Sequence, residues 1–405
     1  MKYIILVGDG MGDLPMSELN GKTPLETANT PTMDHLCQHG ELFRLQTIPE
    51  GMQPGSDIAN LSLLGYEPQH FYTGRAPLEA ASMGIDLQAG ETAFRCNLVT
   101  LDKNADGTLT MTDFSAGHIP TDESSLLIKG LQEELGSSWI HFYPGISYRH
   151  LLVYKNSPAG LETVPPHDYI GRDVTEYWSR YMKFPEMQLL VESACRLLEK
   201  HHLNKMRLVR GLLPANGIWL WGEGKAPVIP TIKEQFGLKG SLISAVDLLK
   251  GIGIYGGLDI INVEGATGYL DTNYAGKADG ALKALEEQDF VFVHVEAPDE
   301  AGHQGSVIDK IQAIEDFDAK IVKPVLEGLQ SMAGSPDFRL VVCMDHLTPV
   351  SIQTHSAAPV PVLLYDSRKT AKGSDLAYSE ANGERTGALL TSGRDFFSKL
   401  LQKEG

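Results

Sequence analysis

The stretch Lys2-Tyr-Ile-Ile-Leu-Val7, which runs directly into Gly8-Asp-Gly-Met-Gly-Asp13, decides the fold. Its apolar residues follow one another without alternating, which is typical of a strand buried on both faces in a parallel sheet. A glycine turn after such a strand is where open α/β sheets place ligands. The N-terminus therefore predicts a parallel sheet with functional residues at the carboxyl ends of its strands. Asp9 is the first of these candidates.

The same apolar pattern returns near the other end of the chain. Continuous apolar runs over 290–295, 340–344 and 360–365 predict three more buried strands, and 307–329 has the spacing of an amphipathic helix. Elements that alternate in this way are typical of an α/β layer structure. We therefore expect one doubly wound sheet whose strands come from both ends of the chain.

The middle of the chain has a different pattern of predicted elements. Residues 122–135 and 185–201 predict amphipathic helices, and 150–154 predicts a short strand. The simplest organisation is an insertion into the sheet domain. We expect a discontinuous core over 1–76 and 214–405, and an inserted smaller α/β (α+β) domain over 77–213.

The composition limits the partners. The chain has 405 residues, with 34 Lys and Arg against 52 Asp and Glu, which gives a net charge of −18. Nucleic-acid binding needs a basic face, so this balance argues against it, although local cations can still bind an anionic substrate. The four cysteines stand far apart, no secretory leader precedes them, and no apolar run approaches the ~20 residues of a membrane helix. We expect a cytoplasmic protein that binds neither nucleic acid nor a membrane; its oligomeric state stays open.

Side chains of the types that can bind metals stand where the predicted strands end. They are Asp9, Asp299, His303, Asp345 and His346, and His355 comes nine residues after His346. If the turn after residue 295 is helical, the i,i+4 spacing puts Asp299 and His303 on one face. Each residue alone is explained as well by a turn, a cap or packing, and their joint placement is what favours ligation. Three carboxylates and three imidazoles without a thiolate suit two divalent ions such as Mn, Zn or Mg.

A candidate nucleophile lies in Pro54-Gly-Ser-Asp57, just before the apolar stretch 58–64. We expect Ser56 at a helix N-terminus, where free N–H groups and the positive end of the dipole favour phosphate and an ionised oxygen. A plain helix cap is the alternative. The sequence has no G-x-S-x-G elbow, so a hydrolase triad is unsupported and activation of Ser56 by a bound metal is the better candidate.

These segments together resemble a known family. Asp9-Gly-Met-Gly12, Pro54-Gly-Ser-Asp57, Tyr72-Thr-Gly-Arg75, Ala297-Pro-Asp-Glu-Ala-Gly-His303, Asp345-His346 and Thr354-His-Ser356 are similar to the cofactor-independent phosphoglycerate mutases, in the archaeal-type branch of the alkaline phosphatase superfamily. The match runs through essentially the whole chain in order. It implies an alkaline-phosphatase-like fold and the interconversion of 3-phosphoglycerate and 2-phosphoglycerate in glycolysis and gluconeogenesis, with no need for bisphosphoglycerate.

The resemblance also implies roles for the residues. One ion would be held by Asp9, Ser56, Asp345 and His346, and the other by Asp299, His303 and His355. Mn would be the preferred metal, with Mg, Zn or Co as alternatives. Ser56 would take the phosphoryl group as a phosphoserine and return it to a neighbouring hydroxyl of the same glycerate.

Four basic side chains are candidates for binding the phosphorylated substrate. They are His118, Arg149 and Arg172 of the inserted domain and Lys239 of the core. Arginine suits bidentate capture of oxyanions, and lysine acts as a point charge. The alternative for each is a solvated surface charge.

Part of the sequence departs from the archaeal mutases. The stretches 56–65, 74–79 and 113–118 look closer to a bacterial sub-branch whose members have been proposed as homoserine kinases. Two alternatives therefore stay open: phosphoryl transfer to another acceptor such as homoserine, and a metal-dependent phosphatase. The kinase alternative predicts a nucleotide requirement, yet the sequence has no P-loop or kinase-type glycine loop.

Overall fold

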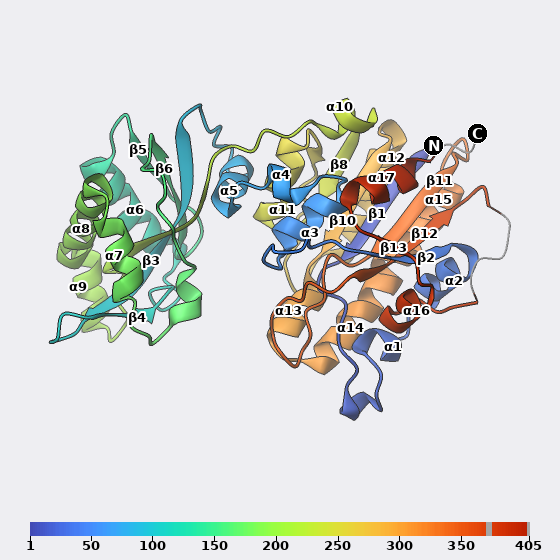
Figure 1. The fold of residues 1–405 in the computed structure, drawn as a ribbon, viewed down its shortest axis with the longest axis horizontal. Helices are drawn as coiled ribbons and strands as arrows, with labels where there is room; N and C mark the ends of the chain where they lie inside the picture. The colour runs from blue at the N-terminus through green and yellow to red at the C-terminus, as the bar shows by residue number, and fades with distance from the viewer. Residues whose placement is uncertain (370–374, 403–405) are drawn as a thin grey trace. The chain divides into compact units, whose positions relative to one another are not determined.

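Figure 1 shows the computed structural model of the chain, which describes residues 1–369 and 375–402. The chain forms two compact units, a core unit of Met1–Tyr72 with Val228–Gly405 and an inserted unit of Thr73–Pro227. The sequence analysis placed the crossings after residues 76 and 213. The second crossing comes later because β7 (Gly217–Gly224) pairs with β3 (Glu91–Lys103) and so belongs to the inserted unit.

The core unit is built on one mixed sheet. Its strand order is β13 (Leu389–Leu390), β2 (Glu41–Leu45), β12 (Val360–Asp366), β11 (Phe338–Cys343), β1 (Lys2–Gly8), β10 (Phe290–Val295), β8 (Gly240–Ile243) and β9 (Asp259–Ile260). The strands β11, β1, β10 and β8 run parallel, with Tyr3 opposite both Phe290 and Arg339. The strands expected over 2–7, 290–295 and 360–365 are confirmed, and the one expected over 340–344 begins at Phe338.

One strand of this sheet runs in the opposite direction. β12 is antiparallel to β11, with Cys343 opposite Val362. A strand that runs backwards begins at the edge where its neighbour ends. The segment before β12, which contains His355, therefore lies at the same sheet edge as the carboxyl ends of β1, β10 and β11.

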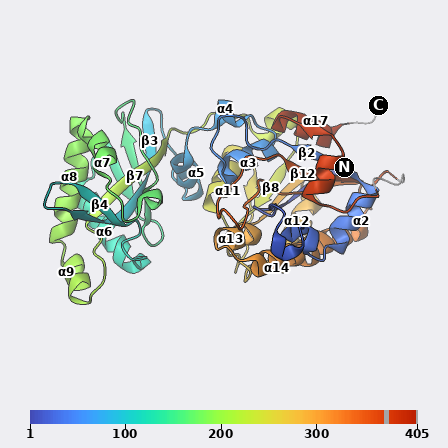
Figure 2. The same cartoon turned by 60° about the horizontal axis from the view of Figure 1, so that its bottom comes forward.

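Helices cover both faces of the core sheet (Figure 2). One group contains α2 (Pro31–His39), α12 (Tyr274–Glu287), α14 (Val307–Phe317) and α15 (Lys323–Ser331), and the other contains α3 (Ser56–Leu63), α11 (Asp247–Tyr255) and α17 (Gly393–Leu401). The helix expected over 307–329 is interrupted by a π-helical turn at Asp318–Val322. Proline near the start of α15 explains the interruption, because Pro324 has no N–H for the preceding turn. Shorter helices complete the unit: η1 (Ser17–Leu19), α1 (Pro24–Thr27), α4 (Pro68–Phe71), α10 (Ile232–Phe236), α13 (Ala297–His303) and α16 (Glu380–Arg385).

The inserted unit is a second, antiparallel sheet with helices. Its long central strand β3 pairs with β4 (Leu109–Asp113), β6 (Arg149–Lys155) and β7, and β5 (Ile140–Tyr143) pairs with β6. The helices are α5 (Arg75–Ser82), α6 (Thr121–Leu135), η2 (Pro166–Tyr169), α7 (Thr175–Met182), α8 (Pro185–Lys200) and α9 (His202–Val209). Apolar residues of β3 and β6 pack with those of α6 and α8 in one core. The helices expected over 122–135 and 185–201 are thus confirmed as α6 and α8, and the strand expected over 150–154 lies within β6.

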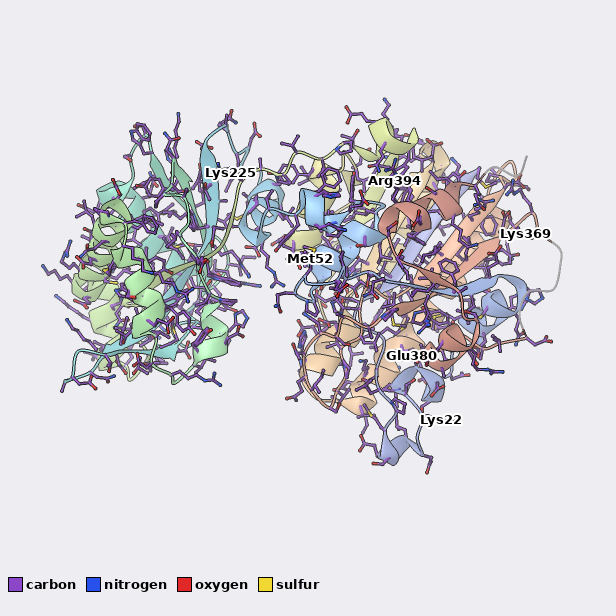
Figure 3. The ribbon with its side chains drawn as sticks, viewed as in Figure 1. Lys22, Met52, Lys225, Lys369, Glu380 and Arg394 are labelled. Atoms are coloured by element: carbon purple, nitrogen blue, oxygen red, sulfur yellow. The ribbon has the colours of Figure 1, made fainter. Side chains whose placement is uncertain are left out.

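The two crossings are tied to one another at the base of the inserted unit. Thr73 Oγ1 donates a hydrogen bond to the carbonyl of Lys225, 2.6 Å away, and Lys225 is labelled in Figure 3. Within 1–369 and 375–402, no helix combines the length and the apolar content that a membrane crossing requires.

Candidate active site

Ser56 is the first residue of α3. Gly55 precedes it and offers no side chain to cap the helix, so the start of α3 is left to the backbone N–H groups and the serine. The Ser56 hydroxyl oxygen lies 3.2 Å from Nε2 of His346. One turn later, the side-chain amide of Asn60 donates to the Ser56 carbonyl at 2.8 Å and to Asp345 Oδ2 at 2.9 Å. The nucleophile expected at a helix N-terminus is thus positioned beside Asp345 and His346.

Asp345 and His346 follow β11 and are completely buried. Asp345 Oδ1 accepts hydrogen bonds from the backbone N–H of Gly10 at 3.0 Å and of His346 at 2.8 Å. Burial would raise the pKa of Asp345, but the nearby imidazoles of His346 and His294, together with hydrogen bonds such as that from Gly10 N–H, lower it below its usual value. This carboxylate is therefore held ionised by fixed donors from the loops after β1 and β11.

Asp9 follows β1 and faces the same pair. Its Oδ1 atom lies 3.5 Å from His346 Nε2, and Asp9, Asp345 and His346 form a group whose ligand atoms could hold one ion. Oδ1 of Asp9 is buried and has no hydrogen-bond partner among the described residues. Burial, together with repulsion from Asp345 and Asp299, raises the pKa of Asp9 well above its usual value. A cation at this position would offset that repulsion.

A second group lies next to the first. Asp299 and His303 share one face of α13, and His303 Nε2 lies 3.2 Å from Asp299 Oδ2. His355 Nε2 lies 3.7 Å from Asp299 Oδ1 and 3.0 Å from His303 Nε2. Hydrogen bonds from His303 and His355 hold the pKa of Asp299 well below its usual range, although burial alone would raise it. Asp299, His346 and His355 form the other group that could hold an ion, so His346 stands between the two groups.

The ring orientations fit metal ligation. His303 can donate from Nδ1 to the carbonyl of Gln353 at 3.0 Å, which leaves the lone pair of Nε2 facing the cluster. Thr348 donates its hydroxyl hydrogen to Asp299 and lies 3.2 Å from Nδ1 of His346, so it can accept from that ring. Metal-binding histidines ordinarily donate their other ring N–H in this way. With three carboxylates, three imidazoles and no thiolate, the donor set fits two divalent ions of the Mn, Zn or Mg kind.

The substrate candidates fall into two groups. His118 and Arg149 of the inserted unit are exposed and both face Tyr148, with the His118 ring 6.0 Å and the Arg149 guanidinium 5.8 Å from its ring centre. Arg172 is also exposed, and its carbonyl accepts from Met111 N–H in β4. Lys239 is not brought to the site. It precedes β8, and its carbonyl accepts from Asp289 and Phe290, at the amino end of the strands, about 20 Å of strand from the carboxyl edge.

The inserted unit also presents basic residues that the sequence analysis did not single out. Arg95 of β3 stacks on Trp221, with its guanidinium carbon 4.0 Å from the ring centre, and pairs with Glu79 at 3.1 Å. The same Trp221 lies 5.4 Å from the ring of His167. Ring contacts through Phe114 connect this group to His118 and Tyr148, so the cationic side chains share one aromatic surface. The residues of this aromatic surface come from strands and turns far apart in the sequence, so no short motif predicts it.

Three further residues around the ligands were also missed, and two of them left a signal. Asn60 is a polar residue four positions after Ser56, on the same face of an apolar helix. His294 interrupts the apolar run of β10, where every residue is buried. Thr348 left no signal, because only the fold brings its hydroxyl to Asp299 and His346.

Comparisons with known proteins point to one family. The family model described as 2,3-bisphosphoglycerate-independent phosphoglycerate mutase matches residues 37–204. Over 403 residues the chain is 47% identical to a "Probable 2,3-bisphosphoglycerate-independent phosphoglycerate mutase" of Geobacter sulfurreducens, with 100% of both chains covered. The solved PH0037 protein from Pyrococcus horikoshii is similar with a TM-score of 0.82 and 29% identity, over 100% of this chain and 99% of that one. The cofactor-independent phosphoglycerate mutase from Thermoplasma acidophilum has a TM-score of 0.65 and 27% identity, over 99% of each chain.

Proposed function

The chain belongs to the family of 2,3-bisphosphoglycerate-independent phosphoglycerate mutases, and on this premise we propose that it interconverts 3-phosphoglycerate and 2-phosphoglycerate through a phosphoserine at Ser56. One observation carries the proposal. Ser56 stands at the start of α3, with its hydroxyl 3.2 Å from an imidazole that lies among three carboxylates. This is the neighbourhood that a serine needs to act as a nucleophile toward phosphorus.

Two divalent ions, with Mn preferred, complete the proposed site. The first is held by Asp9, Ser56, Asp345 and His346, and the second by Asp299, His303 and His355, as the family resemblance implies. When bound, such ions lower the pKa of a serine hydroxyl and offset the negative charge on the phosphoryl oxygens. The unpartnered Asp9 Oδ1 and the Nε2 atom of His303, which faces the ligand cluster, support this assignment.

The chain's own residues guide the transfer. Ser56 Oγ bonds to phosphorus while the bond from phosphorus to the glycerate oxygen breaks, and the other glycerate hydroxyl then takes the group from phospho-Ser56. The backbone N–H groups at the start of α3, where Gly55 supplies no capping side chain, favour the phosphoryl group in both states. Asn60 fixes the Ser56 backbone and Asp345 together, so the nucleophile keeps its place during both half-reactions.

Basic residues of the inserted unit bind the glycerate in this proposal. His118 and Arg149 supply the positive charge beside Tyr148, and Arg95 adds a guanidinium that lies over the Trp221 ring. Arg172 is a further candidate because its side chain is exposed. Lys239 has no part in it, since it lies at the other edge of the core sheet. The reaction belongs to glycolysis and gluconeogenesis, and four cysteines that stand far apart in the sequence suit the cytoplasm.

The test is an enolase-coupled assay with 3-phosphoglycerate, without bisphosphoglycerate, after removal of metals and with Mn²⁺ added back. We expect Mn²⁺-dependent flux in the unmodified protein and a loss of at least about 1000-fold in Ser56→Ala. Ser62→Ala is the matched control, because Ser62 lies on the same helix and its hydroxyl donates to the carbonyl of Thr47, outside the ligand group. Full flux in Ser56→Ala contradicts the proposed nucleophile.

A second measurement tests the intermediate itself. Acid quenching during turnover, followed by peptide mass spectrometry, should find phosphate on the peptide that contains Ser56. For the substrate surface, Arg149→Met should raise KM more than it lowers kcat, while Arg196→Met, which removes an exposed arginine of α8, should change neither. Unchanged KM in Arg149→Met excludes that residue from substrate binding.

A further inference from the structure

We propose that His294 is a positioning residue that orients the Asp9 carboxylate, so that Asp9 Oδ1 faces the metal-ligand group. The inference rests on the two-metal site proposed above, and it concerns a residue outside the ligand set of that site. His294 lies on β10 opposite Val7 of β1, and its side chain is completely buried. Its ring therefore comes from the strand next to the one that ends in Asp9.

The two residues meet through both backbone and side chain. The backbone N–H of Asp9 donates to the carbonyl of Val295 at 2.9 Å, which fixes the loop after β1 to the end of β10. Nε2 of His294 then lies 3.0 Å from Oδ2 of Asp9. This ring nitrogen has no hydrogen bond to any described residue, although its 3.0 Å distance from Oδ2 is within hydrogen-bond range.

A serine that follows β8 can fix the proton position of this ring. Ser244, which follows β8, accepts a hydrogen bond from the N–H of Val246 at 3.0 Å and lies 3.3 Å from Nδ1 of His294. A serine hydroxyl that accepts from Val246 still has its own hydrogen to donate, and we infer that it donates this hydrogen to Nδ1 of His294. A neutral imidazole then carries its proton on Nε2, the atom that faces Asp9. The ring thus presents a donor, not a ligand lone pair, to the carboxylate.

The backbone of His294 is itself held in place. Nζ of Lys277, which is completely buried on α12, donates to the His294 carbonyl at 3.1 Å. With Oδ2 facing His294, the other oxygen of Asp9 is the one that lies 3.5 Å from His346 Nε2 and has no partner of its own. Restraining one oxygen of a carboxylate fixes the direction of the other, which is the way outer residues orient metal ligands.

The experiment compares Mn²⁺ binding by isothermal titration in metal-free protein and its variants. His294→Leu removes the donor, and His294→Gln returns an N–H close to the position of Nε2. We expect His294→Leu to weaken the affected Mn²⁺ site by about 10- to 100-fold and His294→Gln to restore most of that loss. Ser244→Ala, which leaves the ring in place, should weaken the same site by a smaller factor.

His150→Leu is the matched control for the loss of a buried histidine. His150 is 2% exposed and lies in the inserted unit, where its Nδ1 accepts from the N–H of Gly145. We expect the Mn²⁺ affinity of His150→Leu to equal that of the unmodified protein. Far-UV circular dichroism and thermal melting of the metal-free proteins show which variants fold. If His294→Leu does not fold, Ser244→Ala is used for the test instead.

Several outcomes overturn the inference. Unchanged Mn²⁺ affinity in folded His294→Leu or, where that variant does not fold, in Ser244→Ala excludes a positioning role. Equal losses in His294→Gln and His294→Leu exclude the N–H as the cause. If X-ray absorption of the bound Mn²⁺ shows one imidazole fewer in His294→Leu, then His294 is a ligand and not a positioning residue. If the unmodified protein does not bind Mn²⁺, the two-metal site itself is contradicted. That outcome is distinct from failure of the His294 inference, in which the unmodified protein binds Mn²⁺ and the variants bind it equally well.

Discussion

Nζ of Lys310 donates to Oδ2 of Asp13 at 2.8 Å, and neither side chain is exposed to solvent. The same ammonium group donates to the carbonyls of Gly12 and Thr348, at 2.9 and 2.7 Å. Asp13 Oδ2 also accepts from Val350 N–H at 3.1 Å. One buried ion pair therefore joins the loop that follows Asp9 to the loop that follows His346.

Lys310→Met should destabilise the core unit strongly, by about 3–5 kcal/mol, because it leaves the Asp13 charge buried without its partner. The double variant Lys310→Met with Asp13→Asn should recover part of this loss. Urea unfolding at pH 7 measures both free energies. A double variant no more stable than Lys310→Met contradicts the ion-pair explanation.

Gly10→Ala should disrupt the ligand group. Gly10 has a φ of +56°, and an added Cβ would meet the Asp299 carboxylate and lie 2.5 Å from Thr348 Oγ1. We expect a loss of more than about 3 kcal/mol in unfolding free energy, or weaker Mn²⁺ binding if the loop yields. Gly51→Ala is the matched control, since Gly51 has a φ of +82° with open space around it, and should lose only about 1–2 kcal/mol. Equal losses in the two variants would show that backbone strain alone matters.

Thr348→Val should weaken Mn²⁺ binding by about 10- to 100-fold, because Asp299 and His346 both lose a hydroxyl that orients them. Thr348→Ser retains the hydroxyl and should bind nearly as well as the unmodified protein. Calorimetric titration of the metal-free proteins measures the difference. Tight Mn²⁺ binding by folded Thr348→Val is the contrary result.

Asn60→Leu should lower kcat and leave KM for 3-phosphoglycerate nearly unchanged. The change removes the amide that donates to both the Ser56 carbonyl and Asp345, and each such hydrogen bond contributes about 0.5–1.5 kcal/mol. The enolase-coupled assay measures both constants, and thermal melts monitor the fold. An unchanged kcat in a folded variant excludes a role for Asn60 in holding the nucleophile.

Glu380 makes the stability of the core unit depend on pH. Burial raises the pKa of the Glu380 carboxyl, which is labelled in Figure 3, to about 7, although it accepts from Asp13 N–H and Thr23 Oγ1. The folded state then binds more protons than the unfolded state between about pH 4.5 and 7, so this group lowers the unfolding free energy as the pH rises through that window. Relative to the unmodified protein, Glu380→Gln should therefore be more stable at pH 8 than at pH 5. This change in relative unfolding free energy should be at most about 3 kcal/mol.

Chemical denaturation at pH 5 and pH 8 measures this difference for Glu380→Gln. Glu384→Gln is the control on the same helix, since the side chain of Glu384 is 76% exposed. Its stability relative to the unmodified protein should be the same at both pH values. A pH-independent effect of Glu380→Gln would contradict the burial explanation.

The sequence predicted most of the core, because continuous apolar runs report strands that are covered on both faces. It also predicted that three carboxylates lie close together, since parallel strands end at one edge and Asp9, Asp299 and Asp345 each follow such a strand. The location of His355 was not predictable from this pattern, because it depends on the reversed direction of β12. Lys239 was misassigned for a related reason: it lies at the beginning of a strand, and a local motif does not distinguish the two ends.

The residues around the ligands were harder to predict. Thr348, Lys310 and Ser244 act through contacts between segments that are distant in the sequence, and no spacing rule connects them. The second domain boundary was misplaced because β7 resembles a core strand in its apolar content. Only its pairing with β3 assigns it to the inserted unit.

The central position of β1 in the core sheet bears on the order in which the protein is made. β1 pairs with β10 and β11, whose residues leave the ribosome long after Lys2–Gly8, whereas the inserted unit is one continuous segment. During synthesis the inserted unit can fold while the first strand still waits for its neighbours, because domains fold as units once their residues are available. Asp9 and Ser56 are thus translated early but gain their partners last, and a truncated nascent chain holds no assembled site.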